Sequence, residues 1–130
     1  MQMTFLQPWA PHIRSILRIL AAATFLTHGT MKLFGWPVPM GDGPLDTMML
    51  VAGILELVGG LLLLIGLFSR PVAFLLAGMM AVAYFLAHAP QGFFPALNGG
   101  EAALLFCWVF LYIAAAGPGP ISVDAQLGND

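Results

Sequence analysis

Six side chains in this sequence are of types that could do chemistry, and they lie within or beside its long apolar stretches: His28, Lys32, Glu56, Tyr84, His88 and Glu101. Imidazole, ammonium and phenol groups donate hydrogen bonds to a ligand's oxygen atoms, and a carboxyl group can take up or release a proton. Ionisable groups are costly inside apolar segments and are therefore functional candidates. We expect the six to form a ligand-binding or buried polar cluster, with no residue assigned as catalytic.

Helical spacing places several of these side chains on shared faces. Thr24, His28 and Lys32 follow one another at four-residue intervals and form one stripe on a helix. Glu56 shares its face with small residues, which mark the close approach of membrane helices: Gly53, Gly59 and Gly60. We therefore expect Glu56 to point into a helix contact, either protonated or paired with Lys32 or a histidine, and we favour the pair.

Simpler structural roles stay open for most of these residues. Lys32 lies near a helix end, from which it could reach the headgroups, and His88 could sit at the water interface. Asn98 and Glu101 have the spacing of a capping box, in which the Glu side chain returns to the N-cap amide. We interpret Arg18 as a topology anchor whose side chain snorkels to the membrane surface.

Metal chemistry is a weaker interpretation. A site with two histidines and two carboxylates could use His28, Glu56, His88 and Glu101, but no pair has a compact ligand motif such as HExxH, so no metal is predicted. The eight methionines include the pairs 48–49 and 79–80. A copper relay is one alternative for them, and apolar packing is the preferred interpretation. The lone Cys107 excludes an internal disulfide.

Composition identifies the environment that holds these groups. Hydrophobic residues make up 60% of the chain and charged residues 8%, against about 25% charged in a typical globular domain. So few charges cannot cover a soluble protein's surface. Four cations and a net charge of −2 also exclude a nucleic-acid partner. The chain is therefore expected to be an integral membrane protein, with the lipid bilayer as its partner.

Four apolar stretches have about the length that a membrane-spanning helix needs: residues 13–34, 47–68, 71–89 and 100–116. The apolar runs are continuous and do not alternate, which favours helices over a barrel. Pro and Gly residues end the stretches, and Asp46 is the expected N-cap of the second. The predicted fold class is all-α, a single transmembrane domain over residues 1–130 built as an antiparallel four-helix bundle.

The cations set the expected orientation. Arg14, Arg18 and Arg70 fall on one side of such a bundle, together with both termini, and that side should be cytoplasmic. The connections 35–46 and 90–99 then face outward, and the six candidate residues belong to the outer half. Arg18 interrupts the first apolar stretch, so we expect that segment to be retained and not cleaved as a signal peptide. The expected location is a bacterial inner membrane, with several passes.

Several short motifs, in this order and spacing, resemble the DoxX family of small four-helix membrane proteins. They are the run His28-Gly29-x-x-Lys32, the run Glu56-Leu57-Val58-Gly59-Gly60, Glu101 at the start of the fourth stretch, and the Gly117-Pro118-Gly119 ending with Ser122 and Asp124. The resemblance covers about residues 14–124. Some members are membrane subunits linked to thiosulfate–quinone oxidoreduction, and others are linked to thiol and oxidative-stress complexes. Such a likeness implies a role only by analogy.

The leading hypothesis is an accessory membrane subunit of a quinone- or thiol-linked redox system, with a small-molecule site in the outer half. Quinone is the ligand we expect. Its carbonyl oxygens need donors (Lys32, His28 or His88), and its ring needs aromatic walls (Tyr84 and Trp108). No electron-carrying cofactor is evident, so electrons would come from a redox partner protein, and the chain itself would be non-catalytic or a quinone-reacting subunit.

Two other functions remain open. A small proton-coupled transporter, assembled as a homo-oligomer, could use the buried Glu56. Apart from Arg18, however, the polar groups are confined to one half, which counts against a continuous path. A membrane scaffold without a ligand would use Lys32 and Glu56 only as a buried pair.

Overall fold

The computed structural model describes residues 2–130, and all regular structure in that range is helical. Four long helices carry the fold: α1 (Ala10–Phe34), α2 (Thr47–Ile65), α3 (Ser69–Ala83) and α5 (Glu101–Ala116). Short elements flank and connect them: η1 (Thr4–Trp9), η2 (Tyr84–His88), η3 (Ala89–Gln91), α4 (Pro95–Asn98) and α6 (Val123–Gln126).

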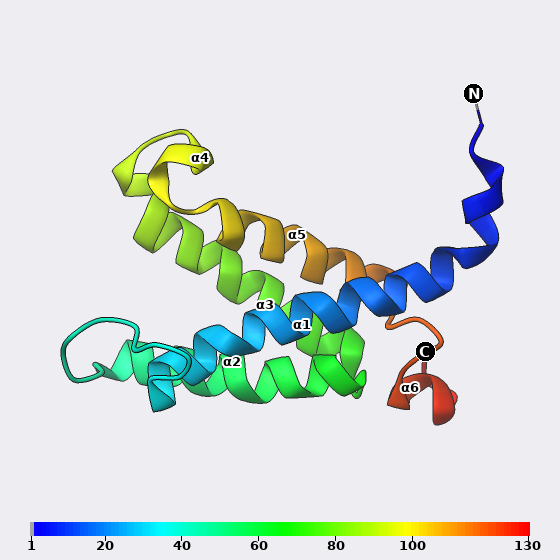
Figure 1. The fold of residues 1–130 in the computed structure, drawn as a ribbon, viewed down its shortest axis with the longest axis horizontal. Helices are drawn as coiled ribbons and strands as arrows, with labels where there is room; N and C mark the ends of the chain where they lie inside the picture. Colours follow the sequence, from blue (N-terminus) through cyan, green and yellow to red (C-terminus); the bar gives the residue numbers. More distant parts are fainter. Residues whose placement is uncertain (1) are drawn as a thin grey trace.

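The long helices form two antiparallel pairs. Helix α1 packs along α2, and α3 packs along α5, whereas contact between the pairs is much thinner. Figure 1 shows the pairs converging at one end and diverging at the other. We call the convergent end, with residues 66–70 and 117–127, the closed end. The divergent end, with residues 35–46 and 84–100, is the open end. Both termini lie toward the closed end (Figure 1).

Glycines allow α1 and α2 to approach closely. A Cβ atom added at Gly29 would lie 2.8 Å from the backbone nitrogen of Leu57, and one at Gly53 would lie 3.0 Å from the Leu33 side chain. A side chain at position 29 would collide with the α2 backbone, and one at position 53 would require the Leu33 side chain to shift. Glu56 is buried on the same face, so the prediction that the glycine face of this helix makes a helix contact is confirmed.

Apolar side chains hold the two pairs together in the middle of the molecule. Phe25 of α1 makes an edge-on contact with Phe110 of α5, with ring centroids 5.0 Å apart. Leu63 of α2 and Leu76 of α3 are buried in the same cluster. Burying such side chains is worth about 1.5–3 kcal/mol each in water, and inside a bilayer close packing supplies the stabilisation in its place.

The helix ends follow their local sequence with one exception. Asp46 caps α2 by accepting a hydrogen bond from the Met49 backbone N–H at 2.7 Å, as predicted. Gly66 ends α2 in the left-handed conformation that glycine adopts freely. The exception lies in the third apolar stretch, where the α-helix gives way to a π-turn, η2, before Pro90. A π-turn rotates the residues after it relative to the helix, and such turns are frequent at functional sites.

The prediction that the Arg18 side chain snorkels to the membrane surface is wrong. Arg18 is 1% exposed, and its guanidinium donates hydrogen bonds to three backbone carbonyl groups. The Leu63 oxygen lies 2.8 Å from Nε, the Ile121 oxygen lies 2.7 Å from Nη2, and Nη1 donates to Pro118. The chain after α5 folds back across the closed end. Its backbone carbonyl groups that are not bonded within a helix accept hydrogen bonds from the guanidinium, and so they replace the membrane headgroups as its partners.

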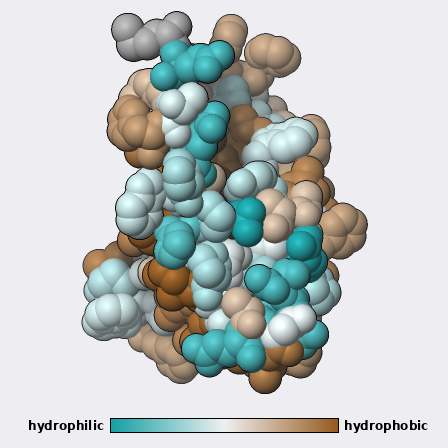
Figure 2. Space-filling view, turned by 90° about the vertical axis from the view of Figure 1, so that its right-hand side faces the viewer, coloured by the Kyte–Doolittle hydropathy of each residue, from teal (hydrophilic) through white to brown (hydrophobic). Residues whose placement is uncertain are grey.

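Asp124 completes the closed end. Its two carboxylate oxygens accept hydrogen bonds from the backbone N–H groups of Phe68 and Ser69, at 2.9 and 2.8 Å, and so cap α3 from 55 residues away in the sequence. Burial by itself would raise the pKa of Asp124, but the hydrogen bonds from Ser69 and Phe68 and the charge of Arg18 outweigh it and hold the pKa below its ordinary value. Hydrophilic side chains gather over this end (Figure 2).

Two helical segments are long and apolar enough to cross a membrane, Thr47–Ile65 and Ser69–Gln91. Helix α5 is apolar but has only 16 residues. Helix α1 has 25 residues but carries three cations, Arg14, Arg18 and Lys32, which lower its hydropathy. Exposed apolar side chains cover the outside of all four long helices, as lipid contact requires. The protein therefore has the character of a helical membrane protein.

Candidate functional site

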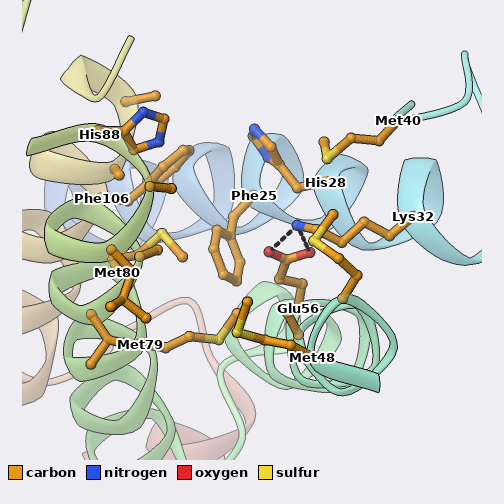
Figure 3. A pocket seen from close by; sticks show the side chains of 18 of the residues that line it. Phe25, His28, Lys32, Met40, Met48, Glu56, Met79, Met80, His88 and Phe106 are labelled. Carbon is orange, nitrogen blue, oxygen red and sulfur yellow. Dashed lines mark hydrogen bonds and ion pairs between the residues drawn. The ribbon is translucent and has the colours of Figure 1, made fainter. Parts of the chain in front are cut away.

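A cavity of about 470 Å³ lies between the two helix pairs toward the open end. Its volume falls within the range of about 300–1,000 Å³ that is typical of small-molecule sites. The wall is mostly apolar, with aromatic rings from α1 and α5 (Phe25 and Phe106) and only a few polar groups. Figure 3 shows the side chains of α1, α2, α3 and α5 that point into it.

Lys32 and Glu56 form an ion pair at the wall of this cavity. The Lys32 Nζ atom lies 2.6 Å from one carboxylate oxygen and 2.8 Å from the other. The two side chains are 10% and 4% exposed. The predicted pairing of Glu56 with Lys32 is therefore confirmed, and Glu56 is held from α2 against α1 (Figure 3). Because Lys32 has three N–H donors, one more remains for a ligand in the cavity.

His28 lies one turn before Lys32 and also lines the cavity. Its ring stands edge-on to Phe106, with centroids 6.0 Å apart. The Nδ1 atom is buried, and within the described part of the chain it has no hydrogen-bond partner. A buried ring nitrogen without a partner is costly, and because this atom is closed off from the cavity, a ligand bound there does not reach it.

His88 reaches the cavity from the π-turn at the end of α3. Its Nδ1 atom lies 3.3 Å from the backbone carbonyl oxygen of Asn98. A carbonyl oxygen can only accept, so Nδ1 carries the hydrogen, and the Nε2 of the neutral ring keeps its lone pair. In this tautomer the His88 ring offers a ligand an acceptor at Nε2, whereas the quinone hypothesis uses His88 as one of three alternative donors.

Tyr84 and Glu101 are not among the residues that line the cavity. The Tyr84 hydroxyl accepts a hydrogen bond from the Asn98 side chain at 3.3 Å, and its ring packs against Gly100. Glu101 is exposed at the first position of α5. The capping-box alternative for Glu101 is wrong, because Gly100 is the N-cap and the Asn98 side chain accepts from the Gly100 N–H at 2.8 Å.

Methionines line the cavity although none was among the site residues predicted from the sequence. Five of the eight in the chain line this one cavity, and they come from α2, α3 and the loop between α1 and α2: Met40, Met48, Met49, Met79 and Met80. Figure 3 shows several of their sulfur atoms turned toward the space. The paired methionines at 48–49 and 79–80 were the available signal, but their convergence depends on how the helices are placed.

The structure does not bring the proposed oxygen and nitrogen metal ligands together. Among the described residues, no three His, Cys, Asp or Glu side chains are close enough to share an ion. Glu56 already uses both oxygens on Lys32, and Glu101 is exposed and does not line the cavity. The cavity can instead hold a flat, mostly apolar molecule against the Phe25 and Phe106 rings, which contact each other edge-on with centroids 5.5 Å apart, with a donor at Lys32 and an acceptor at His88.

These features define a class, a helical membrane protein with a small-molecule cavity between two helix pairs. The chain belongs to the DoxX family, whose model matches residues 13–89. It is also similar to an uncharacterized protein of Haemophilus influenzae, with 45% identity over 128 residues that cover 94% of this chain and 96% of the relative. No solved structure matches the chain. The resemblance seen in the sequence is thereby confirmed.

Proposed function

We propose that this protein is an accessory membrane subunit of a redox system and that its open-end cavity binds the headgroup of a quinone. The observation that carries the proposal is the Lys32–Glu56 pair at the wall of an otherwise apolar cavity of about 470 Å³. A third Lys32 N–H can donate to a quinone carbonyl, while the contacting Phe25 and Phe106 rings form one aromatic wall for the quinone ring. Glu56 lies next to that donor and can exchange a proton with the ligand.

The shape of the bundle also supports a lipid-soluble ligand. The helix pairs diverge toward the open end, so a molecule dissolved in the bilayer could enter the cavity from the side. In this proposal the protein lies in a bacterial inner membrane. Four helical segments each cross it: α1, α2, α3 with η2, and α5. Both termini lie on the cytoplasmic side, because Arg14, Arg18 and Arg70 gather toward the closed end.

A proton-coupled carrier has less support. Such a carrier needs a polar route through the bundle, but the Arg18 guanidinium is fully engaged with three carbonyl groups at the closed end. The buried core around Phe110, Leu63 and Ile113 separates that end from the cavity. The cavity is therefore better suited to a ligand that enters and leaves on one side.

The test is to extract the protein from membranes in a mild detergent and to measure bound quinone by mass spectrometry. We expect close to one quinone per chain. Two matched variants locate it, because Ala102 and Ala115 are both exposed positions on α5 but only Ala102 lines the cavity. Ala102→Phe should lose the quinone, whereas Ala115→Phe should keep it. A quinone content near zero in the wild-type protein, or equal contents in the two variants, would contradict the proposal.

A further inference from the structure

The structure points to a second ligand for the open-end cavity: we infer that it binds a soft monovalent cation, Cu(I), through methionine thioethers and the His88 imidazole. The inference does not rest on the proposed quinone. It rests on where the sulfur atoms lie, on the hydrogen bond that orients His88, and on the lack of a free carboxylate among the described residues that line the cavity.

The distribution of methionine is the first observation. If methionine served only to fill apolar space, it should be spread through the core. The core cluster of buried residues includes Met80, and Met79 packs against it, but Met40, Met48 and Met49 belong to neither group. By contrast, five methionines from separate segments line the one cavity.

Thioether chemistry gives these residues a preferred ligand. Soft sulfur and imidazole ligands select Cu(I), whereas carboxylate and carbonyl oxygens suit Mg²⁺ and Ca²⁺. Thioethers are neutral and need not lose a proton, and the long, flexible methionine side chain can close around an ion. Lys32 and Glu56 neutralise one another, so the wall does not repel a single positive charge. Both carboxylate oxygens of Glu56 accept hydrogen bonds from Lys32, so this carboxylate is not free to bind a hard cation.

The orientation of His88 is the second, independent observation. A histidine that binds a metal through one ring nitrogen usually donates the other ring N–H to a carbonyl or a carboxylate. His88 makes this bond, from Nδ1 to the carbonyl oxygen of Asn98 at 3.3 Å, and its Nε2 lone pair stays available. The π-turn presents this ring to the cavity from the same segment, Ser69–Gln91, that carries Met79 and Met80.

The experiment titrates purified full-length protein in detergent with Cu(I) under anaerobic conditions, against a chromogenic Cu(I) chelator. Ag(I) serves as a redox-inert probe in a parallel titration, and Ca²⁺ as a hard-cation control. We expect about one equivalent of Cu(I) or Ag(I) per chain and no comparable uptake of Ca²⁺. X-ray absorption of the loaded protein should show sulfur in the copper coordination shell.

Variants then assign the ligands. The double change Met79→Leu and Met80→Leu keeps side-chain volume, as does Met48→Leu with Met49→Leu at more exposed positions. Each should lower Cu(I) affinity by about 10- to 100-fold, the loss typical when a metal site is perturbed. The matched control, Met3→Leu with Met31→Leu, alters methionines that do not line the cavity and should bind as the wild type does.

The outcomes separate this inference from the quinone proposal. Stoichiometric Ag(I) binding that is lost only in the cavity variants supports it, whether or not a quinone co-purifies. No uptake of either ion by the wild type would overturn it. Equal uptake by the cavity variants and the control would also overturn it, because the ion would then bind elsewhere. The 48–49 variant decides the matter if the 79–80 variant does not fold.

Discussion

Lys32 and Glu56 are held together across the α1–α2 contact by two short bonds, of 2.6 and 2.8 Å, from one ammonium to both carboxylate oxygens. Neither side chain is more than 10% exposed. For a buried ion pair of this kind, removing one partner and removing both partners change the free energy of unfolding by different amounts. Breaking it by removing one partner leaves an uncompensated charge, whereas replacing both partners with neutral groups can cost little.

The first prediction concerns this pair. Glu56→Gln should lower the free energy of unfolding by about 3–5 kcal/mol, because the Lys32 ammonium loses its counter-charge. Adding Lys32→Met should recover much of that loss. Thermal unfolding in detergent of the wild type, the single variant and the double variant measures both effects. A single variant as stable as the wild type, with no gain from Lys32→Met, would show that the pair does not stabilise the fold.

The second prediction concerns Arg18. Arg18→Lys keeps the charge, but an ammonium cannot match the fork of donors that reaches Leu63, Pro118 and Ile121. Each buried carbonyl left without a donor should cost about 1–3 kcal/mol. Arg14→Lys is the matched control on the same helix, since no hydrogen bond from the Arg14 Nε atom holds other elements. Similar melting temperatures for the two variants would contradict the role assigned to Arg18.

The third prediction concerns acid sensitivity at the closed end. The lowered pKa of Asp124 means that the folded protein favours the ionised carboxylate. Its stabilising contribution is therefore complete above the unfolded-state pKa of about 3.9, and it is lost as the pH falls through the lower folded-state value. At pH 7, Asp124→Asn should destabilise the fold by about 1.5–3 kcal/mol, the worth of hydrogen bonds to a charged group.

Unfolding experiments at several pH values measure the Asp124 contribution. The difference between wild type and Asp124→Asn should be constant from about pH 5 to pH 8 and should shrink below about pH 4. Asp42→Asn, in the exposed loop between α1 and α2, serves as the control and should show no comparable difference. A difference that grew on acidification would have the wrong sign for this mechanism.

The fourth prediction concerns topology. In a background in which Cys107 is replaced by Ala, single cysteines in the loops 35–46 and 90–99 should react with an impermeant thiol reagent added to intact cells. Cysteines in the closed-end tail, for example at Leu127, should react only after the inner membrane is opened. Labelling of the tail from outside would reverse the proposed orientation and move the cavity to the cytoplasmic side.

The sequence alone was sufficient for the helical membrane class, because continuous apolar runs with few charges allow few other structures. The DoxX resemblance and the Asp46 cap were also readable, since both depend on residues close together in the chain. The Lys32–Glu56 pair could be anticipated because a deep carboxylate needs a partner, and antiparallel helices brought a lysine to a similar depth.

Only the tertiary structure decided the roles of Arg18, Asp124 and the methionines. Arg18 meets Pro118, 100 residues away, and Asp124 caps a helix that begins 55 residues earlier. Such contacts depend on how the chain after α5 folds back, and no periodicity in the sequence encodes that path. The sulfur atoms converge for the same reason. Helical spacing sets which face a methionine occupies, but the register and divergence of the two helix pairs determine which faces share a cavity.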